Sequence, residues 1–64
     1  MDNQKKIADF LHNGLKLSRY ELQEDGRIII SSSISNLQVL LDFVKPLNYY
    51  LFFSGGSIHV MHNN

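Results

Sequence analysis

The sequence contains no cysteine, no tryptophan and a single proline in 64 residues. Without cysteine the chain has neither disulfides to compensate for a small core nor thiolate ligands for a structural zinc ion. A chain of this length buries only about 60% of the surface that its unfolded form exposes. Its stability must therefore come from helix–sheet packing within one domain, residues 1–64, or from a partner subunit.

The second half of the sequence has little charge. Residues 1–32 hold five Lys or Arg and five Asp or Glu, whereas residues 33–64 hold only Asp42 and Lys45. The formal net charge of zero removes the usual electrostatic argument for binding nucleic acid or an acidic membrane. An uncharged half of a small protein more often forms an interface than a solvated surface, so the composition favours a protein partner.

The sequence also lacks long apolar runs. The first residues, MDNQKK, lead into an amphipathic pattern, and no stretch has the length of a transmembrane helix or the character of a signal-peptide core. The absence of cysteine does not distinguish one redox compartment from another. We therefore expect a cytoplasmic protein without membrane contacts, as the default rather than from a targeting signal.

Apolar periodicity and turn residues predict the order helix, strand, strand, twice in succession. Helical spacing predicts one helix over residues 3–13 and a second that starts at a Ser35–Gln38 capping box and ends before Pro46. Asp2 or Asn3 is expected to cap the first helix. Strands are expected over residues 15–23 and 28–30, and on both sides of Gly55-Gly56.

The turns predict how the strands of each hairpin align. A two-residue Asp25-Gly26 turn would mix polar and apolar residues on one face, whereas a three-residue loop ending at Gly26 pairs Leu22 with Ile28. We therefore expect the second alignment. A two-residue Gly55-Gly56 turn gives the second hairpin the pairs Phe53–Ile58, Phe52–His59, Leu51–Val60 and Tyr50–Met61.

A weak internal repeat supports an α+β fold. Ile7–Leu11 resembles Leu40–Val44, and Gly26–Ile30 resembles Gly56–Val60, so each half is one αββ unit. The expected architecture, αββαββ, is a single four-stranded antiparallel sheet with both helices on one face. Strand order 2-1-3-4 would place Tyr49–Phe53, which is apolar at every position, in the centre of the sheet.

Two helices on one face leave the other face of the sheet uncovered, and this face is the candidate binding surface. The residues expected there are Tyr50, Phe52, His59 and Met61, with Ile29 at the edge. Aromatic and apolar residues with charges kept to the rim are typical of a protein interface. The sequence thus predicts a non-enzymatic interaction module, either a homodimer or the binder of a heterologous protein. A small regulator or inhibitor of another protein is one role that fits such a module.

Single-stranded nucleic acid, RNA in particular, is the alternative partner. Tyr50, Phe52 and His59 on one sheet face could stack against bases, and basic residues of the first hairpin, Arg19 and Arg27 among them, could border them. The Lys/Arg-Gly-aromatic pattern of RNA-recognition domains is absent, and the second hairpin has no basic residue. The protein interface therefore remains the favoured interpretation.

No residue pattern points to catalysis, a metal or a cofactor. There is no GxSxG or other nucleophile signature, and the serines near residue 33 fit loop and capping roles. His59 and His62 are three apart on one strand, so their side chains point to opposite faces and cannot share a metal ion. So small a domain also has little depth for a substrate pocket. We expect no catalytic residue, no cofactor and no small-molecule substrate.

Overall fold

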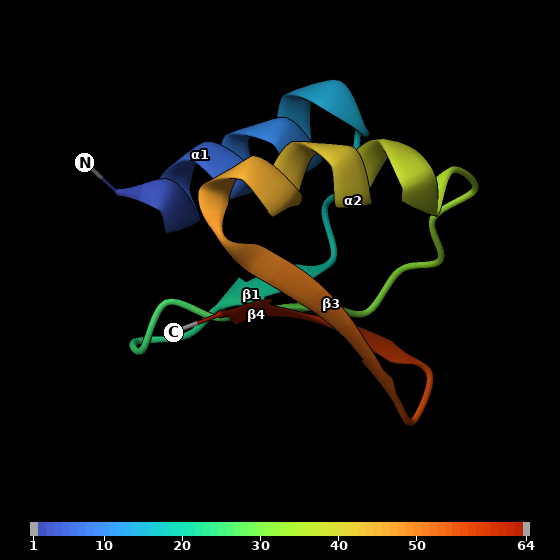
Figure 1. Ribbon diagram of the computed structural model, residues 1–64. Coiled ribbons are helices and arrows are strands. Elements are labelled where there is room, and N and C mark those ends of the chain that lie inside the picture. Colours follow the sequence, from blue (N-terminus) through green and yellow to red (C-terminus); the bar gives the residue numbers. More distant parts are fainter. Residues whose placement is uncertain (1, 64) are drawn as a thin grey trace.

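The computed structural model describes residues 2–63, which form a sheet covered on one side by helices (Figure 1). The predicted αββαββ order and the single antiparallel sheet are confirmed. The elements are α1 (Asn3–Asp9), a π-helical turn η1 (Phe10–Gly14), β1 (Tyr20–Leu22), β2 (Ile28–Ile30), α2 (Leu37–Val44), a 3-10 turn η2 (Lys45–Leu47), β3 (Tyr49–Ser54) and β4 (Ser57–His62).

The first helix begins at the predicted cap and ends in a wider turn. The Asp2 carboxylate accepts hydrogen bonds from the backbone N–H groups of Gln4, at 3.1 Å, and Lys5, at 3.4 Å. After α1 the chain widens into η1, and the Leu15 N–H donates to the Phe10 carbonyl at 3.0 Å. The Phe10 ring stacks on Phe43 of α2, with ring centroids 4.1 Å apart, so this turn also joins the two helices.

Two local predictions fail where other hydrogen bonds or backbone angles prevail. The capping box does not form: Asn36 is the N-cap residue of α2, and the Gln38 amide donates to the Asp42 carboxylate at 2.8 Å instead of reaching back. The strand expected over residues 15–23 is shortened to β1. Lys16 has a φ of +59°, which is not an extended conformation, so the strand cannot include it. The first hydrogen bond between the two strands is the one that the Ser31 N–H donates to the Arg19 carbonyl, at 2.9 Å.

Both predicted hairpin alignments are confirmed. In the first hairpin Leu22 lies opposite Ile28, and Gly26 has the left-handed φ of +99° that the loop requires. In the second, Phe53 lies opposite Ile58, and the glycines of the turn have φ values of +55° and +82°. Positive φ at both central residues defines the turn that matches the twist of a two-residue hairpin.

The strand order differs from the predicted 2-1-3-4: the sheet runs β1-β2-β4-β3, and this part of the prediction is wrong. In both strand orders the chain crosses from β2 to the parallel strand β3 over one intervening strand. The preference for right-handed crossovers therefore does not distinguish the two orders. Burial does choose. The centre beneath the helices is filled by β-branched residues, and aromatic β3, of which only Tyr49 is buried, takes an edge. The central residues are Ile28, Ile30, Ile58 and Val60.

The contact between β2 and β4 follows the symmetry of the internal repeat. Ile29 lies opposite His59, and on either side of this pair Ile28 faces Val60 and Ile30 faces Ile58. The repeat makes Ile28 equivalent to Ile58 and Ile30 equivalent to Val60, so a pseudo-twofold axis passes between Ile29 and His59. The two αββ halves therefore meet along their inner strands.

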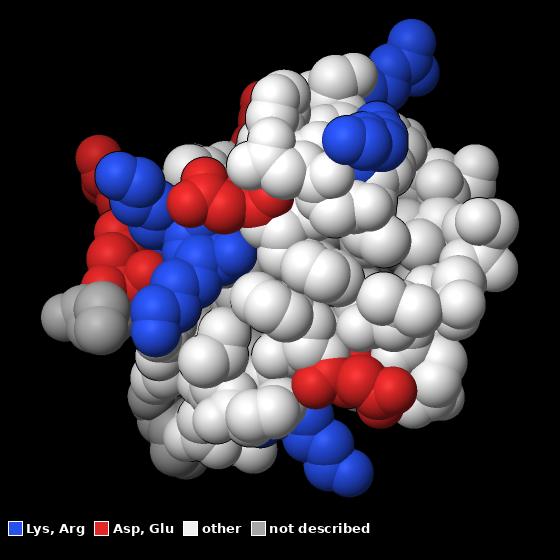
Figure 2. All heavy atoms as spheres, turned by 90° about the horizontal axis from the view of Figure 1, so that it is seen from above, with Lys and Arg blue, Asp and Glu red and all other residues white. Residues whose placement is uncertain are grey.

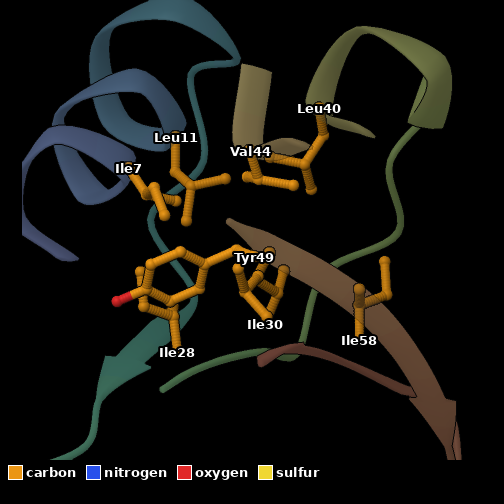
Figure 3. Packing of buried hydrophobic residues seen from close by; sticks show 9 residues of the cluster. Ile7, Leu11, Ile28, Ile30, Leu40, Val44, Tyr49 and Ile58 are labelled. Carbon is orange, nitrogen blue, oxygen red and sulfur yellow. The ribbon is translucent and has the colours of Figure 1, made fainter. Parts of the chain in front are cut away.

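The core lies between the helices and the sheet (Figure 3). Ile7 and Leu11 project from the first helix, and Leu40 and Val44 from the second, towards the isoleucines of the sheet. The ring of Tyr49 extends over Ile28 and closes one end. Neither helix within residues 2–63 has the length and apolar character needed to cross a membrane.

Candidate functional site

The candidate surface is the side of the sheet that faces away from the helices, here called the open face. Side chains alternate along a strand, and the buried residues of β2 and β4 point to the helices, so their neighbours point to the open face. The structure thus brings all five predicted residues together on one face. They are Ile29 from β2, His59 and Met61 from β4, and Tyr50 and Phe52 from β3.

The five residues form two adjoining rows across the sheet. In the first row Ile29 lies opposite His59, and His59 lies opposite Phe52. The rings of Phe52 and His59 meet edge to face, with centroids 6.0 Å apart. In the second row Tyr50 lies opposite Met61. The rows make one continuous surface, in which the Phe52 and His59 rings pack against each other.

This surface is accessible and uncharged. Tyr50 is 42% exposed and Phe52 is 53% exposed, while Ile29, His59 and Met61 are half-buried by their neighbours. Charge borders the open face at β1, where Glu21 lies opposite Ile29. An apolar centre with charge at its margin has the composition of an interface core and rim.

The observed strand order changes the position of individual residues within the surface. Ile29 was expected at an edge, but β2 is an inner strand and Ile29 lies near the middle of the sheet. Tyr50 and Phe52 lie on the outer strand β3 instead. Tyr50 and Phe52 consequently border the outer edge of the sheet, whereas Ile29, His59 and Met61 lie on its inner strands.

A second apolar feature, which the sequence analysis missed, lies on the opposite side of β3. A groove of about 270 Å³ separates α2 from β3, and we call it the α2–β3 groove. Its walls are Leu37, Gln38, Leu41, Tyr50, Leu51 and Phe53. The unbroken apolar run in β3 was its sequence signal, but from that run we predicted a strand in the centre of the sheet. In the structure Leu51 and Phe53 line this groove, Phe52 lies on the open face, and Tyr50 contributes to both surfaces.

Charged groups gather at the other end of the molecule. Seen from the helix side, charged atoms of both signs gather at the end with the β1–β2 loop, further charged groups lie elsewhere on this face, and the end with the β3–β4 hairpin shows none (Figure 2). In that loop the Arg27 Nε donates to both carboxylate oxygens of Asp25, at 3.0 and 2.8 Å. The hydrogen bond from Arg27 holds the pKa of Asp25 below its usual value. Arg27 is therefore already engaged with an acidic group.

One buried tyrosine ties the two hairpins together beneath the helices. The Tyr49 hydroxyl donates to the Gly26 carbonyl at 3.1 Å, and its ring meets His62 edge to face at 4.9 Å. Burial, with smaller contributions from the charges of Asp2 and Asp25, raises the pKa of Tyr49. These contacts are structural, since Tyr49 points to the helix side and not to the open face.

Metal-ligating groups do not converge in the part of the chain that the structure describes. Across residues 2–63 no three His, Asp or Glu side chains approach closely enough to hold an ion. Comparisons of the chain with models of protein families, with curated proteins and with solved structures found no match.

Proposed function

We propose that this protein is a non-catalytic interaction module that binds through the open face, either to a second copy of itself or to a heterologous protein. A role as a small regulator or inhibitor of another protein fits such a module, and a cytoplasmic location stays a prediction. The observation that carries the proposal is the joined, uncharged surface of Tyr50, Phe52, His59, Met61 and Ile29, two of whose aromatic side chains are more than 40% exposed.

Exposure of this surface is unfavourable for an isolated chain. Contiguous apolar patches on a small protein mark contacts more often than solvated surface. Each square ångström of apolar surface removed from water contributes about 25 cal/mol. Burying Tyr50 and Phe52 against another chain would therefore add to a core that is thin in so short a domain.

The test is the mass in solution across a dilution series, measured by sedimentation for three proteins. Phe52→Asp places a charge on the most exposed aromatic position of the open face. Val39→Asp is the matched control, because Val39 is 39% exposed on α2, away from the open face. We expect the wild type to self-associate, with a dissociation constant for the open-face contact that rises at least tenfold in Phe52→Asp and is unchanged in Val39→Asp.

Circular dichroism of each variant should show an intact fold, so that lost association is not lost folding. A wild-type chain that stays monomeric at every concentration would contradict self-association through the open face. Equal effects of Phe52→Asp and Val39→Asp would also contradict self-association through the open face. They would mean that an added charge anywhere on the surface weakens association.

Binding of single-stranded nucleic acid makes a different prediction. It requires affinity that falls with salt concentration and is lost in Phe52→Ala while the fold survives. Two features speak against it: β3 and β4 carry no basic residue, and Arg27 is engaged by Asp25. Titration of a labelled oligonucleotide at two salt concentrations separates the two functions.

A further inference from the structure

The two edges of the sheet are built differently. β1 has three residues, carries Glu21 in its centre and follows Arg19. β3 has six residues in unbroken register with β4, and it contains no charge and no proline. Short length and charge are devices that prevent edge-to-edge pairing, and β1 has both whereas β3 has neither. Of the two edges formed by residues 2–63, the β3 edge is the one left able to accept another strand.

The outer side of β3 offers regularly spaced backbone groups. In an antiparallel pair the N–H and C=O groups of alternate residues point to the partner strand and the others point away. The Asn63 N–H donates to the Asn48 carbonyl at 2.9 Å, so the even-numbered residues of this segment face β4. The backbone N–H and C=O groups of Tyr49, Leu51 and Phe53 therefore point outward, away from β4. Within residues 2–63 no strand pairs with this side.

The α2–β3 groove lies beside this free edge. Four of its six lining residues are leucine or phenylalanine, and none is charged. Phe53 is 57% exposed although it points to the helix side, because the hairpin extends past the helices (Figure 1). A strand added to β3 in antiparallel orientation would place its own alternate side chains over this groove.

We propose that the outer edge of β3 pairs with β3 of a second copy of this chain, joining the two four-stranded sheets into one sheet of eight strands. The inference rests on the proposed function and deepens it by naming the partner and the contact. Three observations favour a second copy. β3 is uncharged, so two copies approach without repulsion. An antiparallel strand pair about a twofold axis is self-complementary. The exposed Phe53 of each copy is the apolar group that can cover the groove of the other.

The twofold axis that relates the two copies of β3 passes beside Leu51 or Phe52. With the axis at either position, most residues of β3 pair with β3 of the other copy. Either choice leaves the open faces of the two copies on the same side of one continuous sheet. Packing of two such sheets through their open faces would close an assembly of four chains with two kinds of twofold contact. The edge contact and the face contact can therefore be removed one at a time.

The first experiment measures mass by sedimentation in a variant that lacks the face contact. His59→Asp places a charge on the open face of inner strand β4, away from the edge, so any dimer that remains belongs to β3. We expect His59→Asp to remain dimeric and the double variant His59→Asp with Phe53→Lys to be monomeric. The matched control replaces Phe53→Lys by Leu22→Lys in the double variant. Leu22 is 51% exposed and lies opposite Ile28 on the β1 edge, just as Phe53 lies opposite Ile58 on the β3 edge. The control should leave the dimer intact.

The results separate the two hypotheses. A His59→Asp variant that is monomeric, or a dimer that Phe53→Lys leaves unchanged, would overturn the edge pairing. Equal masses for wild type and His59→Asp would instead contradict the open face as a self-interface. A wild-type chain that is monomeric overturns pairing with a second copy and leaves the β3 edge for a strand of another protein.

A second measurement does not depend on charge substitutions. The chain has no cysteine, so single-cysteine variants report one site each. On mild oxidation Leu51→Cys or Phe52→Cys should form an intermolecular disulfide, because the axis brings that residue next to its copy. Glu21→Cys on β1 should not. Absence of any β3 cross-link, or equal cross-linking from β1, would overturn the proposal.

Discussion

Single polar side chains connect segments that are distant in the sequence. Gln4 of α1 donates its side-chain amide to the carbonyls of Gln23 and Arg27, at 2.7 and 3.0 Å. Tyr49 reaches Gly26 in the same loop. The β1–β2 loop is thereby held from above by a helix and from the side by the second hairpin. The carbonyls of Gln23 and Arg27 also accept hydrogen bonds from N–H groups of the hairpin itself, so Gln4 supplies each of them with a second donor.

We expect Tyr49→Phe to reduce the free energy of unfolding by about 1 kcal/mol at pH 7, since it removes the hydrogen bond to Gly26 and leaves the ring in place. Folding raises the pKa of Tyr49, so the folded state holds this proton more tightly than the unfolded state does. The stability from that proton is complete below pH about 10 and is lost as the pH rises through the higher folded pKa.

Urea unfolding at pH 7 and near pH 11 checks this prediction, with Tyr50→Phe as the control on the exposed side of the same strand. The wild type should lose more stability on going to alkaline pH than Tyr49→Phe does. Identical alkaline losses in the two proteins would show that another group is responsible.

At the scale of the element, the turn between β3 and β4 is held by backbone geometry alone. A Cβ built at Gly55 or Gly56 would meet nothing within 4 Å. The positive φ angles are therefore the only constraint on these positions. Asn and Gly tolerate such angles, whereas a β-branched residue does not.

Gly55→Asn should raise the free energy of unfolding by about 0.5 kcal/mol, because Asn adopts the φ of +55° and restricts the unfolded chain. Gly55→Val should lower it by about 1–2 kcal/mol through the strain of a left-handed residue. Urea unfolding at one fixed protein concentration compares the three. A Val variant as stable as the wild type would mean that the turn changes its type.

Patterns within each hairpin were enough to predict its register. Gly26 and the Gly55-Gly56 pair specify the loops, and alternation then fixes which residues oppose each other. The order of the hairpins in the sheet was not predictable in the same way. The crossover from β2 to β3 can pass over either β1 or β4, and the pattern within each hairpin does not show which of these two strands lies in between. The placement of the open-face residues depended on alternation and was predicted, whereas the α2–β3 groove depended on strand order and was not.

At the scale of the whole molecule, stability and association are linked. A domain of this size has a free energy of unfolding of about 3–10 kcal/mol. Its open face and its β3 edge are apolar and uncovered within the described chain. A contact that buries either surface therefore contributes a large fraction of the total.

The melting temperature should accordingly depend on protein concentration. For a dimer, a tenfold increase in concentration adds about 0.7 kcal/mol per chain by mass action. For a domain of this length that corresponds to a rise of about 3–6 °C. Differential scanning calorimetry over a hundredfold range measures it. The double variant His59→Asp with Phe53→Lys should melt at one temperature throughout, and a wild type that does the same would rule out self-association.

The contact between β2 and β4 also determines how the chain finds its fold. Each hairpin and each helix forms from neighbouring residues, but Ile29 and His59 are 30 positions apart (59 − 29). Closing a loop of that length costs about 3 kcal/mol of chain entropy before any compensating contact is made. The hairpins can therefore assemble early, and the meeting of the two inner strands is the slow, committing step.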